Sequence, residues 1–512
     1  MARSIFEIIG PVMVGPSSSH TAGMARIGMM THNILCMDPA SISLVLSPKL
    51  RTTYAGHRSD AALIGGAMGY VEDSDEIRNA LGIAVQKGIR TTVDFLPEGK
   101  YPQNTAKIIM TDVKNEVHSV TGTSVGGGSI QILEIDEAPV TLEADTWNLV
   151  VWGTENLCLP FIPGADGIQS GITPTGDCIK TFTFISRPGE SILDMVRGNK
   201  DVKKLSLAAP VLAYGATRSG YREISSCKEA VKLCASEGIS LAELAVRYEM
   251  ERSGKSRDEI TGLMRTQLTA MKESVVRGQG ENRLLYGLTS GRDGAMLAEA
   301  IAEGKTISKG IIPVAVAKAI GVMEHNGSMG CIVAAPTAGS SGIVPGAMVA
   351  VQEAYDLTDS QLVDALFVSA LMGVIMAEKG VSFSGSVGGC QGEIGVSSAI
   401  TAAGLASIFT DDPETVMHAM ALCMKNLLGL VCDPIAGPIE VPCIKRNAVG
   451  VANSFISADL ALAGIRSFIP PDEVIDALID VEERLPNELK CATIGGLACT
   501  KTAQCVRNKL GQ

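Results

Sequence analysis

The sequence has few aromatic residues and no long uninterrupted hydrophobic run. Phe, Trp and Tyr make up 4% of its 512 residues. The longest uncharged run, residues 326–352, is broken by Gly, Ser and Pro, and the more apolar run at 394–410 is short for a tilted bilayer span. Gly and Pro also interrupt residues 1–19, where a signal peptide needs an apolar stretch. We therefore expect no membrane partner, no export signal and a cytoplasmic protein.

Positive charge is also scarce. The chain has 43 Lys and Arg residues against 55 Asp and Glu residues, a formal net charge of -12. A polyanion such as DNA or RNA would meet net repulsion, so we expect no nucleic-acid partner. Nucleotide-binding signatures are missing as well, because no Gly-Lys-Ser/Thr follows the Gly- and Ser-rich stretch 336–342 and no GxGxxG joins an expected strand to a helix.

What the sequence does contain is enough material for two to four domains with sizeable cores. Residues 1–144 alternate short β-rich runs, such as 42–46 and 107–111, with helical segments, which predicts an α+β module. Residues 145–215 are expected to form a small βαββαβ unit with strands near 148–152, 179–185 and 202–207 and a helix at 190–197.

The remaining residues, 216–512, predict a large all-α domain. Long helical segments with charged faces occupy 228–277, and Ala- and Gly-rich helical segments with few charges follow between 298 and 428. Small residues allow close approach of helices, so the charged helices are expected outside and the Ala- and Gly-rich ones in the core.

Thirteen cysteines in a chain without an expected export signal should stay reduced. Three of them, Cys390, Cys432 and Cys443, lie within two residues of Gly or Pro and outside any long apolar helix, where a sulfur can point at a metal. The alternative is that they are small buried hydrophobic residues. No C-x-x-C pair is present, which disfavours a zinc ribbon, and three thiolates without a nearby fourth leave one corner of a cubane cluster open.

Near the N-terminus, Ser17, Ser18 and Ser19 precede His20 in a stretch where Gly and Pro restrict the backbone. Such a loop can hold a carboxylate or phosphate. The alternative is a serine-rich cap on the helix expected from Ala22.

A second histidine, His57, follows a glycine and precedes a helix. It is a candidate for proton transfer, and the alternative is a capped surface histidine. The stretch 336–342 resembles an anion nest, and Thr337 and Gly339 in it are candidate substrate contacts.

Taken together, these segments resemble the iron-sulfur L-serine dehydratases, with the β part and the α part of that family joined in one chain. The resemblance covers most of the chain, and the order of its motifs makes it specific. It rests on residues 15–21, 56–57, 334–339, 389–393, 430–437 and 441–447.

The resemblance implies an L-serine ammonia-lyase in which Cys390, Cys432 and Cys443 hold a 4Fe-4S cluster. An iron without a protein ligand would act as a Lewis acid on the substrate carboxylate and hydroxyl. His20 or His57 would be the base or orient the carboxylate, and the three serine hydroxyls would bind the carboxylate. The resemblance also makes residues 145–215 an ACT-like unit. We expect an amino acid as the small-molecule substrate, and a homodimer.

Two departures from the family and two rival functions remain at this stage. Ser341 stands where many relatives have Cys, and a terminal cysteine that caps the open iron in some relatives has only Cys499 or Cys505 as substitutes here. One rival is an L-cysteine desulfidase or a related iron-sulfur hydro-lyase on the same scaffold. The other is a non-enzymatic amino-acid-binding regulator, which an open cluster corner disfavours.

Overall fold

The structure is a computed structural model, and it describes residues 3–51, 54–435, 439–491 and 494–510. The chain divides into two compact units. Residues 1–18 and 217–512 form the helical unit, and residues 19–216 form the β-rich unit. The chain thus passes from one unit to the other within the serine motif, between Ser18 and Ser19, and returns after Ala216.

The larger sheet of the β-rich unit has six strands in the order β3-β2-β4-β5-β6-β7. Strand β2 pairs parallel with β3 and antiparallel with β4, and the remaining pairs are antiparallel. The strands are β2 (Pro39–Leu46), β3 (Arg90–Phe95), β4 (Thr105–Asp112), β5 (Val117–Gly126), β6 (Ser129–Ile135) and β7 (Ala138–Glu143). Helices α2 (Gly23–Leu35), α3 (Ser59–Ala67) and α4 (Glu76–Gln86) complete this part, which confirms the expected mixture of helices and strands.

The smaller sheet is antiparallel, with the order β11-β8-β10-β9. Its elements are β8 (Trp147–Gly153), β9 (Gly167–Ile172), β10 (Cys178–Phe184), α5 (Glu190–Arg197) and β11 (Val202–Ala208). The expected strands and the second helix are present, but the first helix of a βαββαβ unit is not. Residues 154–166, all of them described, form turns and irregular chain because Pro160, Pro163 and Gly164 interrupt any helix. Leu157 and Ile162 from this crossover pack into the core of the sheet instead.

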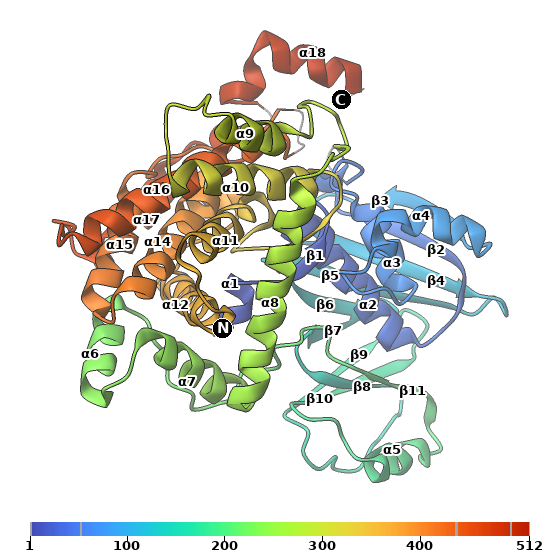
Figure 1. The fold of residues 1–512 in the computed structure, drawn as a ribbon. Coiled ribbons are helices and arrows are strands. Elements are labelled where there is room, and N and C mark those ends of the chain that lie inside the picture. Colours follow the sequence, from blue (N-terminus) through green and yellow to red (C-terminus); the bar gives the residue numbers. More distant parts are fainter. Residues whose placement is uncertain (1–2, 52–53, 436–438, 492–493, 511–512) are drawn as a thin grey trace. The chain divides into compact units, whose positions relative to one another are not determined.

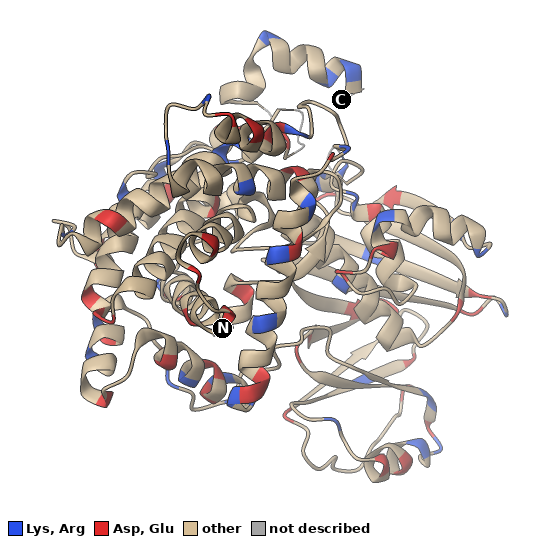
Figure 2. Ribbon diagram, viewed as in Figure 1, with Lys and Arg blue, Asp and Glu red and all other residues tan. Residues whose placement is uncertain are grey.

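The helical unit confirms the predicted helical C-terminal region (Figure 1). Its longer helices are α6 (Cys227–Glu237), α7 (Leu241–Ser253), α8 (Arg257–Gly278), α9 (Asp293–Ala302), α10 (Ile311–Gly327), α11 (Ile343–Tyr355), α12 (Asp359–Glu378), α14 (Val396–Phe409), α15 (Pro413–Lys425), α16 (Cys443–Leu462), α17 (Pro471–Arg484) and α18 (Lys501–Leu510). The last three lie beyond the segments that the sequence pattern predicted. Figure 2 shows acidic and basic residues together on α8, whereas α18 carries only basic ones.

Two segments of the described chain are long and apolar enough to cross a membrane by length and composition, Asp359–Glu378 and Gln391–Phe409. In both, 78% of the most apolar window is buried inside the protein. Burial of this kind is typical of the core helices of a water-soluble protein, and it agrees with the expectation that the Ala- and Gly-rich helices form the core.

The first residues of the chain are built into the helical unit. Helix α1 (Ile5–Ile8) packs on α12, where a Cβ on Gly373 would lie 2.2 Å from Ile8 Cγ2. Strand β1 (Val12–Val14) pairs antiparallel with β12 (Cys331–Val333), more than 300 residues further along the chain.

A fully buried ion pair holds this N-terminal segment. Arg252 donates to Glu249 at 2.6 Å, and their side chains are 1% and 0% exposed. Glu249 also accepts from Ser4 Oγ at 2.9 Å and from the Ile5 backbone N–H at 3.1 Å. The carboxylate therefore joins the start of α1 to α7.

Replacement of Arg252 by Ala would leave the Glu249 carboxylate buried without its partner. We expect a loss of about 3–5 kcal/mol in the free energy of unfolding, measured by urea denaturation, because one member of a buried pair is removed. Arg484→Ala, which breaks the exposed pair with Asp480, is the control and should cost less than about 1 kcal/mol. Equal losses in the two variants would contradict the anchoring role of the buried pair.

Candidate metal centre and substrate loops

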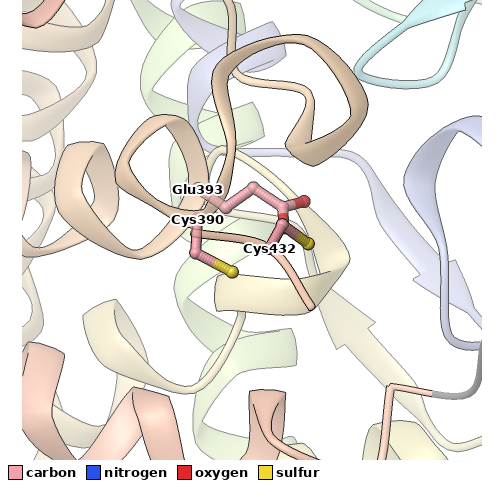
Figure 3. Close-up of side chains that lie close together, drawn as sticks. All are labelled: Cys390, Glu393 and Cys432. Atoms are coloured by element: carbon pink, nitrogen blue, oxygen red, sulfur yellow. The ribbon is translucent and has the colours of Figure 1, made fainter. Parts of the chain in front are cut away.

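Three side chains in the helical unit form a candidate metal centre. The ligand atoms of Cys390, Glu393 and Cys432 all lie within 4.8 Å of one another. Figure 3 shows the Glu393 carboxylate next to the Cys432 sulfur, with the Cys390 sulfur near both. The sequence predicted the two cysteines as ligands. Glu393 lies in the motif 389–393, but sequence reasoning assigned it no role.

The local backbone explains how Cys390 reaches this position. A short helix, α13 (Gly385–Gly388), ends at Gly389, whose φ of +71° is a conformation that L side chains rarely adopt. Cys390 then begins a π-helical turn, η4 (Gln391–Gly395), which continues into α14. Wide turns of this type are frequent at functional sites.

The buried side chain of Gln391 ties this turn to the segment that leads to Cys432. Its backbone N–H donates to Leu430 O at 2.9 Å, and its Oε1 accepts from the Gly429 N–H at 2.8 Å. Its Nε2 donates to Leu478 O at 3.2 Å. These bonds bring two cysteines that are 42 positions apart in sequence into one site.

On its other side, Cys432 is paired with the C-terminal part of the chain. Its backbone N–H donates to Leu489 O at 2.8 Å, and the Cys491 N–H donates to Cys432 O at 2.7 Å. The Cys432 thiol also shares a hydrogen bond with the Cys491 thiol. The tail therefore does fold back on the site, but it brings Cys491 there. Sequence reasoning named Cys499 and Cys505 instead and missed Cys491.

Cys443 is the first residue of α16, which makes it a helix terminus and not a loop residue. It lies close enough to Cys390 and Glu393 for their charges to raise its pKa, although it is outside the group held within 4.8 Å. Asn447, one turn further along α16, donates to both Cys443 O and Gly339 O at 2.9 Å. The amide thus joins the third cysteine to the loop 336–342.

Thr337 and Gly339 both lie against Glu393. The Thr337 hydroxyl donates to the Glu393 carboxylate, and a Cβ on Gly339 would lie 3.5 Å from the carboxylate oxygens. Desolvation raises the pKa of Glu393 to about 7, although the bonds from Thr337 and from the Gly385 N–H act in the opposite direction. The two predicted substrate contacts are therefore next to the candidate metal centre.

Two cysteine thiols at this centre, those of Cys432 and Cys443, are held in their neutral form by their surroundings. Hydrogen bonds with the Cys390 and Cys491 thiols, together with burial, raise the pKa of Cys432 well above its usual value. Burial is the first cause of the raised pKa of Cys443. A bound cation offsets such costs because it neutralises the charge of the thiolates, and metal binding at such a site releases protons.

Gly385 packs closely against two of these ligand side chains. A Cβ on Gly385 would lie 2.8 Å from Glu393 Oε2 and 3.2 Å from Cys432 Sγ. Even one methyl group would therefore crowd two ligand atoms at once. Soft thiolate donors from separate segments fit an iron-sulfur group.

The predicted histidines lie together in the β-rich unit. The rings of His20 and His57 stack with centroids 4.8 Å apart, and the Ser59 hydroxyl donates to His20 O at 2.7 Å. Desolvation and the neighbouring His57 ring lower the pKa of His20 to about 3, so its imidazole is neutral at physiological pH.

The three predicted serines are divided between the two units. Ser17 and Ser18 belong to the helical unit, and Ser19 belongs to the β-rich unit. Ser18 opens a π-helical turn, η1 (Ser18–Ala22), and the Ser19 hydroxyl bonds His20 Nδ1 at 3.0 Å. Ser19 therefore orients the imidazole.

In the helical unit, cysteine thiols and a carboxylate thus gather beside a loop that contains glycine and threonine. The chain belongs to the serine dehydratase alpha chain family, whose family model matches residues 236–498.

Some similar proteins match about half of this chain, and others match nearly all of it. A probable L-serine dehydratase alpha chain of Bacillus subtilis is 41% identical over 283 residues, 55% of this chain and 94% of the relative. The L-serine dehydratase alpha chain of Peptoniphilus asaccharolyticus is 37% identical over 285 residues, 56% of this chain and 97% of its own length. L-serine dehydratase 2 of Escherichia coli is 26% identical over 515 residues and covers 97% of this chain and 98% of its own length. The similarity to the Escherichia coli protein therefore extends over the β-rich part as well.

Proposed function

We propose that this protein is an L-serine ammonia-lyase that converts L-serine into pyruvate and ammonia, with a 4Fe-4S cluster held by Cys390, Cys432 and Cys443. The observation that carries the proposal is the convergence of Cys390 and Cys432 with Glu393 beside the Thr337 loop. Family membership and the names of the relatives supply the substrate and the reaction.

When bound, the cluster would supply a Lewis acid at an iron without a protein ligand, which accepts oxygen ligands from the substrate. The chain's own residues would hold it through three thiolates. Gly385 leaves no room for a side chain beside Glu393 and Cys432. Thr337 holds Glu393 in place through its hydroxyl.

The elimination requires a base for the Cα proton and an acid for the departing hydroxide. The base takes the proton as the Cβ–O bond breaks, which leaves water and aminoacrylate; the aminoacrylate tautomerises to an imine and hydrolyses to pyruvate and ammonia. We assign this base to His20 or His57, whose rings stack on each other, with the His20 imidazole oriented by Ser19. Ser17 and Ser18 would bind the substrate carboxylate.

The proposal also covers the domains of the chain, its oligomeric state and its location. Residues 1–144 would correspond to the β part of the family, residues 145–215 to an ACT-like module and residues 216–512 to the α part. The antiparallel order β11-β8-β10-β9 and the helix α5 support an ACT-like module, although the first crossover lacks its helix. A homodimer and a cytoplasmic location stay predictions, and light scattering of the purified protein measures the first.

Anaerobically purified protein should form pyruvate from L-serine. Activity should decay in air and return with ferrous iron and a thiol reductant, because an iron without a protein ligand is exposed to oxygen. Parallel assays of L-cysteine and of L-threonine, from which 2-oxobutanoate would form, identify the preferred substrate. An iron-free active enzyme that depends on pyridoxal phosphate would overturn the proposal, and faster release of sulfide from L-cysteine would favour the desulfidase.

The ligand assignment predicts about four irons per chain and a brown colour. Replacing Cys390, Cys432 or Cys443 by Ser should bleach the protein, measured by iron analysis and visible absorbance. Cys423→Ser is the matched control, since Cys423 is also fully buried but lies in α15. A full cluster in the Cys432→Ser protein would show that the assignment is wrong.

For the N-terminal loop, we expect His20→Ala to lower turnover by about two or more orders of magnitude without loss of iron, as removal of a general base usually does. Ser18→Ala should mainly raise KM. The control for the β-rich unit is His118→Asn, because His118 lies on β5 and pairs with Asp136. If the loop were only a helix cap, His20→Ala would cost about 1 kcal/mol of stability and leave kcat unchanged.

A further inference from the structure

One cationic side chain lies directly on the candidate metal centre. The guanidinium of Arg446 donates from Nη1 to Cys390 Sγ at 3.3 Å and to Val431 O at 2.8 Å. The donor lies on α16, one turn after Cys443, and the acceptors lie on the two other segments that carry cysteines. One side chain therefore connects all three cysteine-bearing segments.

Asp433 holds this guanidinium in place. Its Oδ1 accepts from Arg446 Nη2 at 2.7 Å, and its Oδ2 accepts from the Leu497 N–H at 2.8 Å. The Arg446 and Asp433 side chains are 16% and 5% exposed, so water does little to screen the pair. The carboxylate is thus shared between the arginine and the C-terminal segment that carries Cys491.

The neighbouring residue on the same helix behaves differently. Lys445 is an exposed cation that pairs with Asp293 on α9. Of the two consecutive basic residues of α16, only Arg446 makes a hydrogen bond to a cysteine sulfur. Lys445 is therefore a matched control for a change of charge on this helix.

Hydrogen bonds to sulfur and nearby positive charge both favour the more negatively charged state of an iron-sulfur group, and they raise its reduction potential. Because the guanidinium is planar and permanently charged, it can serve the sulfur, the carbonyl and the carboxylate at the same time, which a lysine ammonium does poorly.

We infer that Arg446, held by Asp433, is a positioning residue for the iron-sulfur group: it orients the Cys390 thiolate and raises the reduction potential of the group. This inference rests on the proposed function. It adds a role for two residues that do not ligate the metal.

The test compares anaerobically prepared wild-type protein with Arg446→Gln, Arg446→Lys, Asp433→Asn and Lys445→Gln. Iron per chain, the midpoint potential and the rate at which the brown absorbance bleaches in air are measured for each. Arg446→Gln should show a lower potential and several-fold faster bleaching, Asp433→Asn should bleach faster than wild type, and Lys445→Gln should match wild type.

A fully loaded Arg446→Gln protein with the wild-type potential and bleaching rate would overturn the inference. If that variant loses its iron while its circular dichroism remains that of wild type and Lys445→Gln stays loaded, the positioning role is supported. If it fails to fold, Arg446→Lys decides: several-fold faster bleaching supports the inference, and a wild-type rate overturns it. Wild-type protein without iron would instead overturn the proposed function.

Discussion

The geometry of the metal centre depends on the buried side-chain amide of Gln391. The amide accepts a hydrogen bond from the Gly429 N–H and donates one to Leu478 O. The backbone N–H of Gln391 donates to Leu430 O. A buried amide left without hydrogen-bond partners costs about 1–3 kcal/mol. Burial of this side chain therefore requires that the surrounding segments supply those partners. The same bonds that satisfy Gln391 therefore set the approach of the Cys432 segment to the turn that carries Cys390.

Close helix packing completes that constraint. A Cβ on Gly404 of α14 would lie 2.2 Å from Ser369 Oγ, and a Cβ on Gly450 of α16 would lie 2.5 Å from Ile343 Cδ1. Helices α14 and α16, which begin beside Cys390 and at Cys443, are thereby held tightly within the core. The rigid helices position the cysteines, and the Asn447 amide extends the same framework to the loop 336–342.

Local patterns predicted most elements well, and the failures have identifiable causes. Helices α7, α8 and α12 lie where their periodicity placed them, because capping serines or threonines and apolar repeats act over a few residues. The βαββαβ pattern implied a helix at 154–166, but the prolines in this segment prevent one. The pairing of β1 with β12 was beyond prediction, because three residues carry no signal for a partner more than 300 positions away.

The sequence by itself determined the helical character of the C-terminal half, the Gly- and Pro-flanked setting of Cys390, Cys432 and Cys443, and the serine and histidine loop. These follow from residue type and short-range spacing. Only the tertiary structure decided that Glu393 lies with Cys390 and Cys432. It also decided that the cysteine hydrogen-bonded to the Cys432 thiol is Cys491, and that Arg446 donates to a cysteine sulfur. The physical reason is that these contacts join segments separated by up to about 60 residues. They depend on long-range hydrogen bonds of buried polar groups, which sequence spacing does not reveal.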